Sequence, residues 1–141
     1  MAKIAIVYWS GTGNTEEMAE AVAAGAKEGG AEASLITAAD FDVSQLESYD
    51  GFAFGCPAMG DEELEDSEFA PMFESVEGKL GDKPVVLFGS YSWAEGEWMS
   101  KWTDKCREEG INLVADSVIS YEAPGAEETE KCKEIGKALI K

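Results

Sequence analysis

The feature of this sequence that most constrains its fold is a set of short, nearly continuous apolar runs. The clearest runs lie at residues 3–8, 51–56 and 84–88. An apolar run without alternating polar residues is typical of a strand buried on both faces, as in parallel sheets. Weaker strand candidates are residues 33–36 and 113–119, and we expect the second to be a long or broken strand. The runs therefore predict five strands of a buried parallel sheet.

Helical patterns separate these runs. In four stretches, apolar residues recur at the three- and four-residue spacing of a helix that has one buried face. The stretches are marked by Met18, Val22 and Ala26; by Phe69, Met72, Phe73 and Val76; by Trp98, Met99, Trp102 and Cys106; and by Cys132, Ile135 and Leu139. Residues 40–46 are predicted to form a poor helix or a loop. Since each parallel crossover needs a helix and is right-handed, the alternation predicts an α/β fold with helices on both faces of the sheet.

The length and the charge of the chain limit the classes of function. The 141 residues predict a single domain over 1–141, because they contain no repeat and no linker. The formal net charge of −18 disfavours binding to nucleic acid or to anionic lipid. It favours salt-dependent encounter with basic partners, although an acidic surface can also serve only to keep a protein in solution.

The residue types that are missing exclude several chemistries. The sequence contains no histidine, which removes Ser-His-Asp and Cys-His catalysis and any His-ligated zinc or haem. Its three cysteines form no CxxC pair, so we expect no disulfide framework or iron–sulfur site and interpret them as small core residues. We see no signal peptide or membrane span, and we therefore expect a cytoplasmic protein. We also expect no metal site.

Polar segments follow three of the predicted strands. In a parallel sheet, ligands bind at the carboxyl ends of the strands, where the strand order reverses. The first segment opens the first helix, and its glycines and free helix N–H groups can cradle a phosphate without a cation. It lacks the lysine of a Walker A loop and the spacing of GxGxxG. It consists of Ser10, Gly11, Thr12, Gly13, Asn14 and Thr15.

The other two segments follow the third and fourth predicted strands, at residues 51–56 and 84–88. One contains Ala58, Met59, Gly60, Asp61 and Glu62, and it begins an acidic stretch. For residues 63–68 of that stretch we favour a solvated face or helix N-terminal carboxylates. The other contains Ser90, Tyr91, Ser92 and Trp93, and its tryptophan offers a flat surface on which a planar ring can stack. The three segments together predict a site for a phosphorylated planar heterocycle such as FMN.

The chain resembles the short-chain flavodoxins over essentially its whole length. The resemblance is carried by the segments at residues 8–15, 58–62 and 88–93. It implies a flavodoxin-like doubly wound sheet of five parallel strands in the order 2-1-3-4-5. It also implies that residues 10–15 bind the FMN phosphate.

The resemblance implies specific roles at the flavin ring. Trp93 would stack on the outer face of the ring and Met59 on its inner face, while Glu62 would accept a hydrogen bond from N3–H. The turn at residues 59–61 would flip on one-electron reduction, so that the Gly60 carbonyl accepts the N5–H of the neutral semiquinone.

These roles predict a monomeric, low-potential one-electron carrier that holds FMN non-covalently. It would cycle between neutral semiquinone and anionic hydroquinone and would have no substrate turnover of its own. Its expected partners are basic faces of redox enzymes, namely ferredoxin-linked oxidoreductases and flavoprotein reductases. Two alternatives stay open. One is a small quinone or nitro-compound reductase that uses the same flavin, and the other is a receiver-like signalling domain without a flavin.

Overall fold

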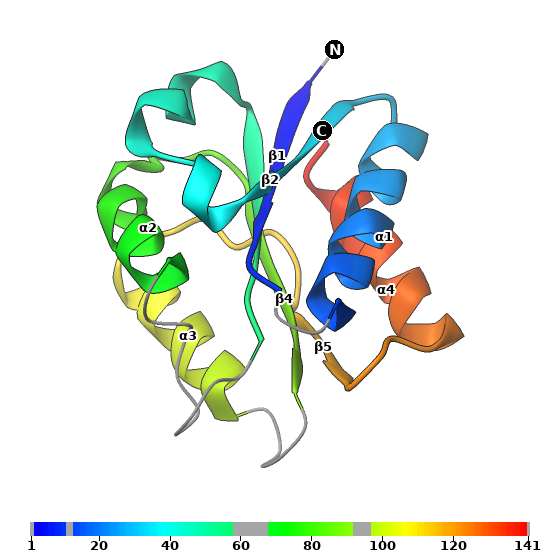
Figure 1. Cartoon of the computed structure of the whole chain (residues 1–141). Helices are drawn as coiled ribbons and strands as arrows, with labels where there is room; N and C mark the ends of the chain where they lie inside the picture. The colour runs from blue at the N-terminus through cyan, green and yellow to red at the C-terminus, as the bar shows by residue number, and fades with distance from the viewer. Residues whose placement is uncertain (1, 11–12, 58–67, 92–96, 141) are drawn as a thin grey trace.

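The computed structural model describes residues 2–10, 13–57, 68–91 and 97–140. All the strands in this part of the chain run parallel in one sheet, in the order β2-β1-β3-β4-β5 (Figure 1). Their bounds are β1 (Lys3–Tyr8), β2 (Glu32–Thr37), β3 (Gly51–Gly55), β4 (Val85–Tyr91) and β5 (Val118–Tyr121). The predicted fold class and strand order are therefore confirmed.

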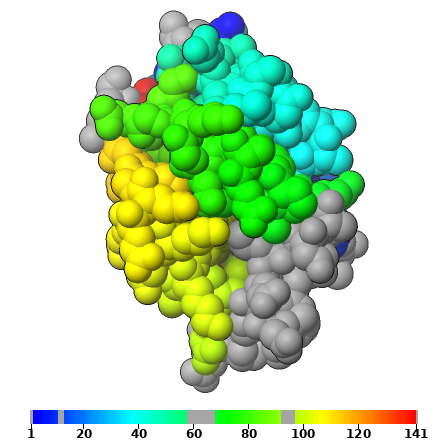
Figure 2. All heavy atoms as spheres, turned by 90° about the vertical axis from the view of Figure 1, so that its left-hand side faces the viewer, coloured from blue at the N-terminus to red at the C-terminus, as the bar shows by residue number. Residues whose placement is uncertain are grey.

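Helices cover both faces of the sheet, as the alternation predicted. On one face lie α1 (Asn14–Glu28) and α4 (Ala126–Ala138), which pack against each other (Figure 1). On the other face lie α2 (Phe69–Val76) and α3 (Glu97–Glu108). Figure 2 shows this second face, where α2 lies between α3 and the segment at residues 38–48. No helix in the described part of the chain is long and apolar enough to cross a membrane.

Two apolar clusters, one on each side of the sheet, form the core. The first joins β3 and β4 to α2 and α3 through large aromatic side chains, including Phe54, Phe73 and Trp102. The second joins β1 to α1 and α4 through smaller side chains such as Ile6, Val22 and Ile135. All five residues of β3 are buried, which explains the unbroken apolar run there.

The structure defines two segments that were only weakly predicted, at residues 40–46 and 113–119. Residues 40–46 run from the end of one short 3-10 helix, η1 (Ala38–Asp40), into a second, η2 (Val43–Ser48). A further one, η3 (Glu77–Lys79), follows α2. The strand candidate at 113–119 is broken. Leu113 forms an isolated bridge to Val85, and β5 begins only at Val118. The expectation of a broken strand was correct, and the regular strand extends two residues farther than predicted.

The carboxyl ends of all five strands point to one edge of the sheet, the lower edge in Figure 1. The strand order reverses between β1 and β3, because β2 lies on one side of β1 and β3 on the other. This switch point is where an open α/β sheet leaves room for a ligand. The predicted phosphate-binding segment follows β1 at this point.

Candidate functional site

The turn between β1 and α1 is built around a glycine and a serine. Gly13 precedes the helix with φ of 95°, a left-handed conformation that favours glycine. Ser10 Oγ accepts hydrogen bonds from the backbone N–H groups of Gly13, at 3.0 Å, and Glu16, at 3.3 Å. The serine side chain therefore fixes the turn to the first turn of the helix.

These bonds leave a defined set of donors at the start of α1. Within the described part of the chain, no residue accepts a hydrogen bond from the backbone N–H of Asn14 or Thr15. The Ser10 hydroxyl accepts two bonds, so its own proton is left to donate elsewhere. The partial positive charge of the helix N-terminus acts in the same direction. The site offers neutral donors to an anion.

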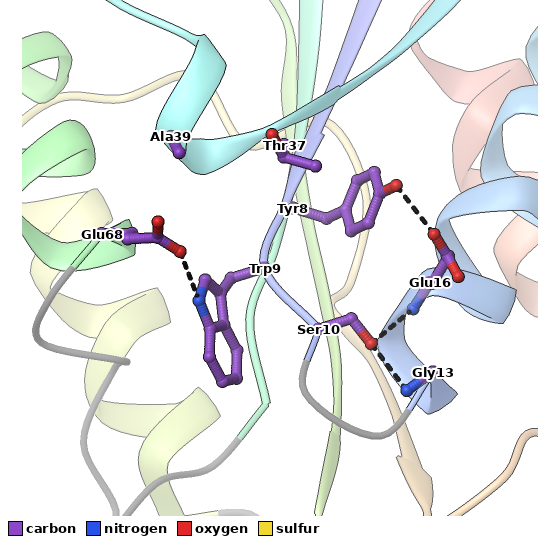
Figure 3. A pocket seen from close by; sticks show the side chains of 8 residues that line it. All are labelled: Tyr8, Trp9, Ser10, Gly13, Glu16, Thr37, Ala39 and Glu68. Carbon is purple, nitrogen blue, oxygen red and sulfur yellow. Dashed lines mark hydrogen bonds between the residues drawn. The ribbon is translucent and has the colours of Figure 1, made fainter.

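A pocket of about 390 Å³ opens beside this turn, at the carboxyl ends of β1 and β2 (Figure 3). Tyr8, Trp9, Thr37 and Glu68 contribute to its walls, and no lysine or arginine is among the described residues that line it. The pocket is polar and anionic in character, since it also includes Glu16. A phosphate near this edge would have to be bound by hydrogen bonds rather than by a cation.

The carboxylate of Glu16 is held away from the serine turn. Tyr8 Oη donates to Glu16 Oε2 at 3.1 Å, and Figure 3 shows the carboxylate directed toward the tyrosine ring. Burial raises the pKa of the Tyr8 hydroxyl, and the bond to Glu16 raises this pKa further. Tyr8 therefore remains a neutral donor at physiological pH. The bond limits the repulsion that Glu16 would exert on an anion at the helix N-terminus.

One buried hydrogen bond connects the start of α1 to β4, and another connects the start of α3 to the residue that follows β3. Thr15 Oγ1 and Ser90 Oγ lie 3.0 Å apart, and both side chains are buried. Trp98 Nε1 donates to the Cys56 carbonyl at 3.1 Å. A side chain at Gly89 would overlap this carbonyl, so the close approach of β4 to the end of β3 requires glycine there. The edge of the sheet is therefore cross-linked beneath the site.

The structure brings the described members of the predicted site to one edge. Ser10, Gly13, Asn14 and Thr15 lie at the start of α1, and Ser90 contacts them through Thr15. The Tyr91 ring, by contrast, packs against the rings of two other aromatic residues, at centroid distances of 5.6 and 5.8 Å. Nine predicted site residues lie outside the described residues, namely Gly11, Thr12, Ala58, Met59, Gly60, Asp61, Glu62, Ser92 and Trp93.

Sequence reasoning missed two residues that shape the site. Trp9 Nε1 donates to Glu68 Oε1 at 2.9 Å, across 59 positions in the sequence. We had interpreted residues 63–68 as a solvated face or as carboxylates at a helix N-terminus. Glu68 is indeed exposed at the start of α2, but it also binds the indole beside the pocket. The signal available in the sequence was Trp9, an aromatic residue next to the serine turn. Its partner, Glu68, could not be identified from the sequence because it lies 59 positions away.

The donor set fits the phosphate of a nucleotide such as FMN. The free N–H groups at the start of α1 and the hydroxyls of Ser10 and Thr15 can bind the phosphate oxygens without a cation. Among the described residues, no group of three or more acidic or cysteine side chains could hold a metal ion.

Comparison with known proteins agrees with this geometry. The family model described as "Flavodoxin" matches residues 6–136. The chain is 43% identical over 138 residues to the flavodoxin of Megasphaera elsdenii, covering 98% of each chain. It is 42% identical over 134 residues to that of Clostridium beijerinckii, covering 95% of this chain and 96% of the relative.

A solved structure matches at the level of the whole fold. The solution structure of two-electron reduced flavodoxin from M. elsdenii superposes with a TM-score of 0.87 at 44% identity, covering 96% of this chain and 97% of the other. The sequence match and the fold agree. The chain belongs to the flavodoxin family of FMN-binding electron-transfer flavoproteins.

Proposed function

We propose that this protein is a one-electron carrier that holds FMN non-covalently at the β1/β3 switch point and works at low potential. In this proposal it shuttles electrons between redox enzymes by cycling FMN between neutral semiquinone and anionic hydroquinone. The observation that carries the proposal is the cation-free donor cradle at the start of α1. Such a cradle suits a phosphate that anchors a cofactor rather than one that is transferred, since none of the described residues that line the pocket is a cation that could stabilise a leaving phosphate.

We assign the phosphate to residues 10–15. Ser10 donates its free proton, and the N–H groups of Asn14 and Thr15 donate along the axis of α1. The Thr15 hydroxyl is oriented by Ser90, so it can accept from Ser90 and donate outward. Gly11 and Thr12 complete the segment on sequence grounds.

We assign the flavin ring to the segments that follow β3 and β4, on the basis of sequence resemblance. Trp93 and Met59 would cover the two faces of the ring, and Glu62 would accept from N3–H. The Gly60 carbonyl would bond N5–H after one-electron reduction. The hydrogen bonds beneath these segments support the assignment, because they bring the end of β3 and the start of α3 together at the same edge.

Ala58, Asp61 and Ser92 complete these two segments as further proposed contacts. Tyr91 is proposed to contribute through its backbone or by shaping the loop, because its ring packs on Trp98 and Tyr121.

The acidic surface supports a low potential for the second electron. At an effective dielectric of about 20, a carboxylate about 10 Å from the flavin opposes an added negative charge by roughly 1.7 kcal/mol before salt screening. About 1.4 kcal/mol corresponds to about 59 mV for one electron. Glu16 and Glu68 line the pocket, and the chain carries a net charge of −18. Several such groups would lower the hydroquinone potential substantially.

The same charge supports the proposed class of partner. We propose that a monomer docks on basic faces of ferredoxin-linked oxidoreductases or flavoprotein reductases in the cytoplasm, and that it has no substrate turnover of its own. Attraction between exposed charges weakens as salt is added, because the Debye length falls to about 8 Å at physiological ionic strength. An affinity for such a partner that is independent of ionic strength would contradict this docking mode.

Stepwise anaerobic reduction with dithionite tests the proposal directly. The FMN-loaded protein should turn from yellow to blue and then to pale, and Gly60→Pro should lower the yield of the blue form by blocking the carbonyl flip. A direct change from yellow to pale would leave FMN binding intact but favour a two-electron reductase, as would rapid bleaching by NADH or NADPH alone. A protein that takes up no FMN would refute the proposal.

A further inference from the structure

The hydrogen bond between Trp9 and Glu68 joins two segments that meet at the site. Trp9 immediately precedes Ser10 of the phosphate turn, and its backbone N–H donates to the Gly55 carbonyl at the end of β3, at 3.0 Å. Glu68 stands at the N-terminus of α2. The backbone of Trp9 is thus fixed by the sheet, whereas the direction of its indole is fixed by the Glu68 carboxylate (Figure 3).

This bond differs from the buried hydrogen bonds at the same edge. Thr15 and Ser90 are buried, as is Trp98, so their bonds belong to the core. Trp9 is only half-buried and Glu68 is exposed. Exposed hydrogen bonds contribute little to folding, because water replaces them when they break. A bond at the rim of a ligand pocket has a different consequence, since it removes rotamers of a large side chain before the ligand arrives.

We propose that Glu68 is a positioning residue for FMN: by accepting from Trp9 Nε1, it holds the indole as a wall of the pocket beside Ser10 and so pre-organises the phosphate turn. This inference rests on the proposed function, since it assumes that the pocket edge binds FMN. Glu68 acts through Trp9 and needs no contact of its own with the cofactor.

The Glu68 side chain combines two properties that substitution can separate. Its Oε1 atom accepts the indole bond, and its charge repels both a phosphate and an anionic flavin. Glu68→Gln keeps an amide oxygen that can accept the bond and removes the charge. Glu68→Ala removes both properties. Trp9→Phe keeps an aromatic ring and removes the donor while leaving the charge in place.

A double-mutant cycle in FMN affinity tests the bond. We expect Trp9→Phe and Glu68→Ala each to weaken FMN binding by about three- to tenfold, the fold-change that corresponds to the net contribution of a typical protein hydrogen bond. The double variant should be no weaker than the weaker single variant, because both changes break one bond. Glu68→Gln should bind FMN within about twofold of the wild type. Glu74→Ala, at an exposed position of α2, is the matched control and should bind like the wild type.

Two further readouts separate positioning from stability and from charge. The urea midpoint of the apoprotein should be the same in all the variants, whereas a structural role would lower it in Trp9→Phe and Glu68→Ala. The second flavin potential should become less negative in Glu68→Gln, which has lost the charge, and change less in Trp9→Phe, which retains it. The potential thus reports the charge, and the FMN dissociation constant reports the bond.

The outcomes distinguish this inference from the proposed function. Additive losses in the cycle, or a Glu68→Gln variant as weak as Glu68→Ala, would overturn the positioning role even if the wild type is a one-electron carrier. A wild type that binds FMN and shows the predicted cycle, but is reduced in a single two-electron step, would overturn the proposed function and leave the positioning role standing. A wild type that binds no FMN would overturn both.

Discussion

The buried pair Thr15 and Ser90 makes a quantitative prediction about the edge of the sheet. The two hydroxyl oxygens lie 3.0 Å apart, and their side chains are 1% and 5% exposed. Within the described part of the chain, each hydroxyl has the other as its side-chain partner. Removing one of them leaves the other buried without a hydrogen bond, which costs about 1–3 kcal/mol.

Thr15→Val and Ser90→Ala are the two perturbations. Valine has the shape of threonine, and alanine differs from serine by one oxygen, so neither change leaves a large cavity. Each single variant should lower the unfolding free energy of the apoprotein by about 1–3 kcal/mol. The double variant should be close to the wild type, because no hydroxyl is left unpaired. The expected coupling energy is therefore about as large as the two single losses added together.

Urea unfolding of the apoprotein measures the cycle, and an unchanged m-value shows that the same surface is exposed in each variant. FMN titration of the same four proteins adds the functional part. Thr15→Val should weaken FMN binding more than Ser90→Ala, since only the former removes a proposed phosphate donor. Single losses that simply add up in the double variant would show that the two hydroxyls do not depend on each other and would refute the reasoning.

Three further predictions concern packing, pH and thiol chemistry. Gly25→Ala should destabilise the fold by about 1–2 kcal/mol despite the helix propensity of alanine, because the added methyl group overlaps the backbone of Lys133 on α4; thermal unfolding measures this. Burial raises the pKa of the Glu77 carboxyl, so its proton is held more tightly in the folded state and its ionisation destabilises the fold as the pH rises. Glu77→Gln should therefore raise the unfolding temperature at neutral pH, and the gain should vanish below the ordinary glutamate pKa. Burial also raises the pKa of Cys106 and Cys132 to about 12, so native protein at pH 8 should resist thiol reagents that label it fully after unfolding.

Each of these predictions has its own control. Gly78→Ala places a methyl group in open space and should stabilise the protein slightly, so an equal effect at Gly25 would contradict the packing argument. A Glu77→Gln gain of the same size at acidic and neutral pH would show that ionisation is not its cause. The Lys105 ammonium lies 3.6 Å from the Glu77 carboxylate and lowers the pKa of Glu77, but it offsets only part of the rise that burial causes. Rapid labelling of Cys106 or Cys132 in the native protein would show that they are not enclosed.

The parts of the fold that could be predicted from the sequence are those that local patterns encode. The run at residues 51–56 is apolar throughout because β3 is buried on both faces, and that property is visible without knowing its neighbours. The turn before α1 was equally visible, since Gly13 and Ser10 lie three residues apart and bond each other; its phosphate role stays a prediction. Residues 40–46 received no definite assignment, although their 3-10 turn carries a local capping box in which Asp42 and Gln45 bond each other's backbone.

The alternation of strands and helices, the parallel sheet and the turn at the start of α1 follow from the sequence alone, because each depends on the spacing of residues close together in the chain. Only the tertiary structure decided which distant side chains meet at the carboxyl edge. Trp9 reaches Glu68 across 59 positions and Thr15 reaches Ser90 across 75. The physical reason is that these bonds depend on strand order, on register and on the direction of each side chain where its strand ends, and these are fixed only when both faces of the sheet are packed at once.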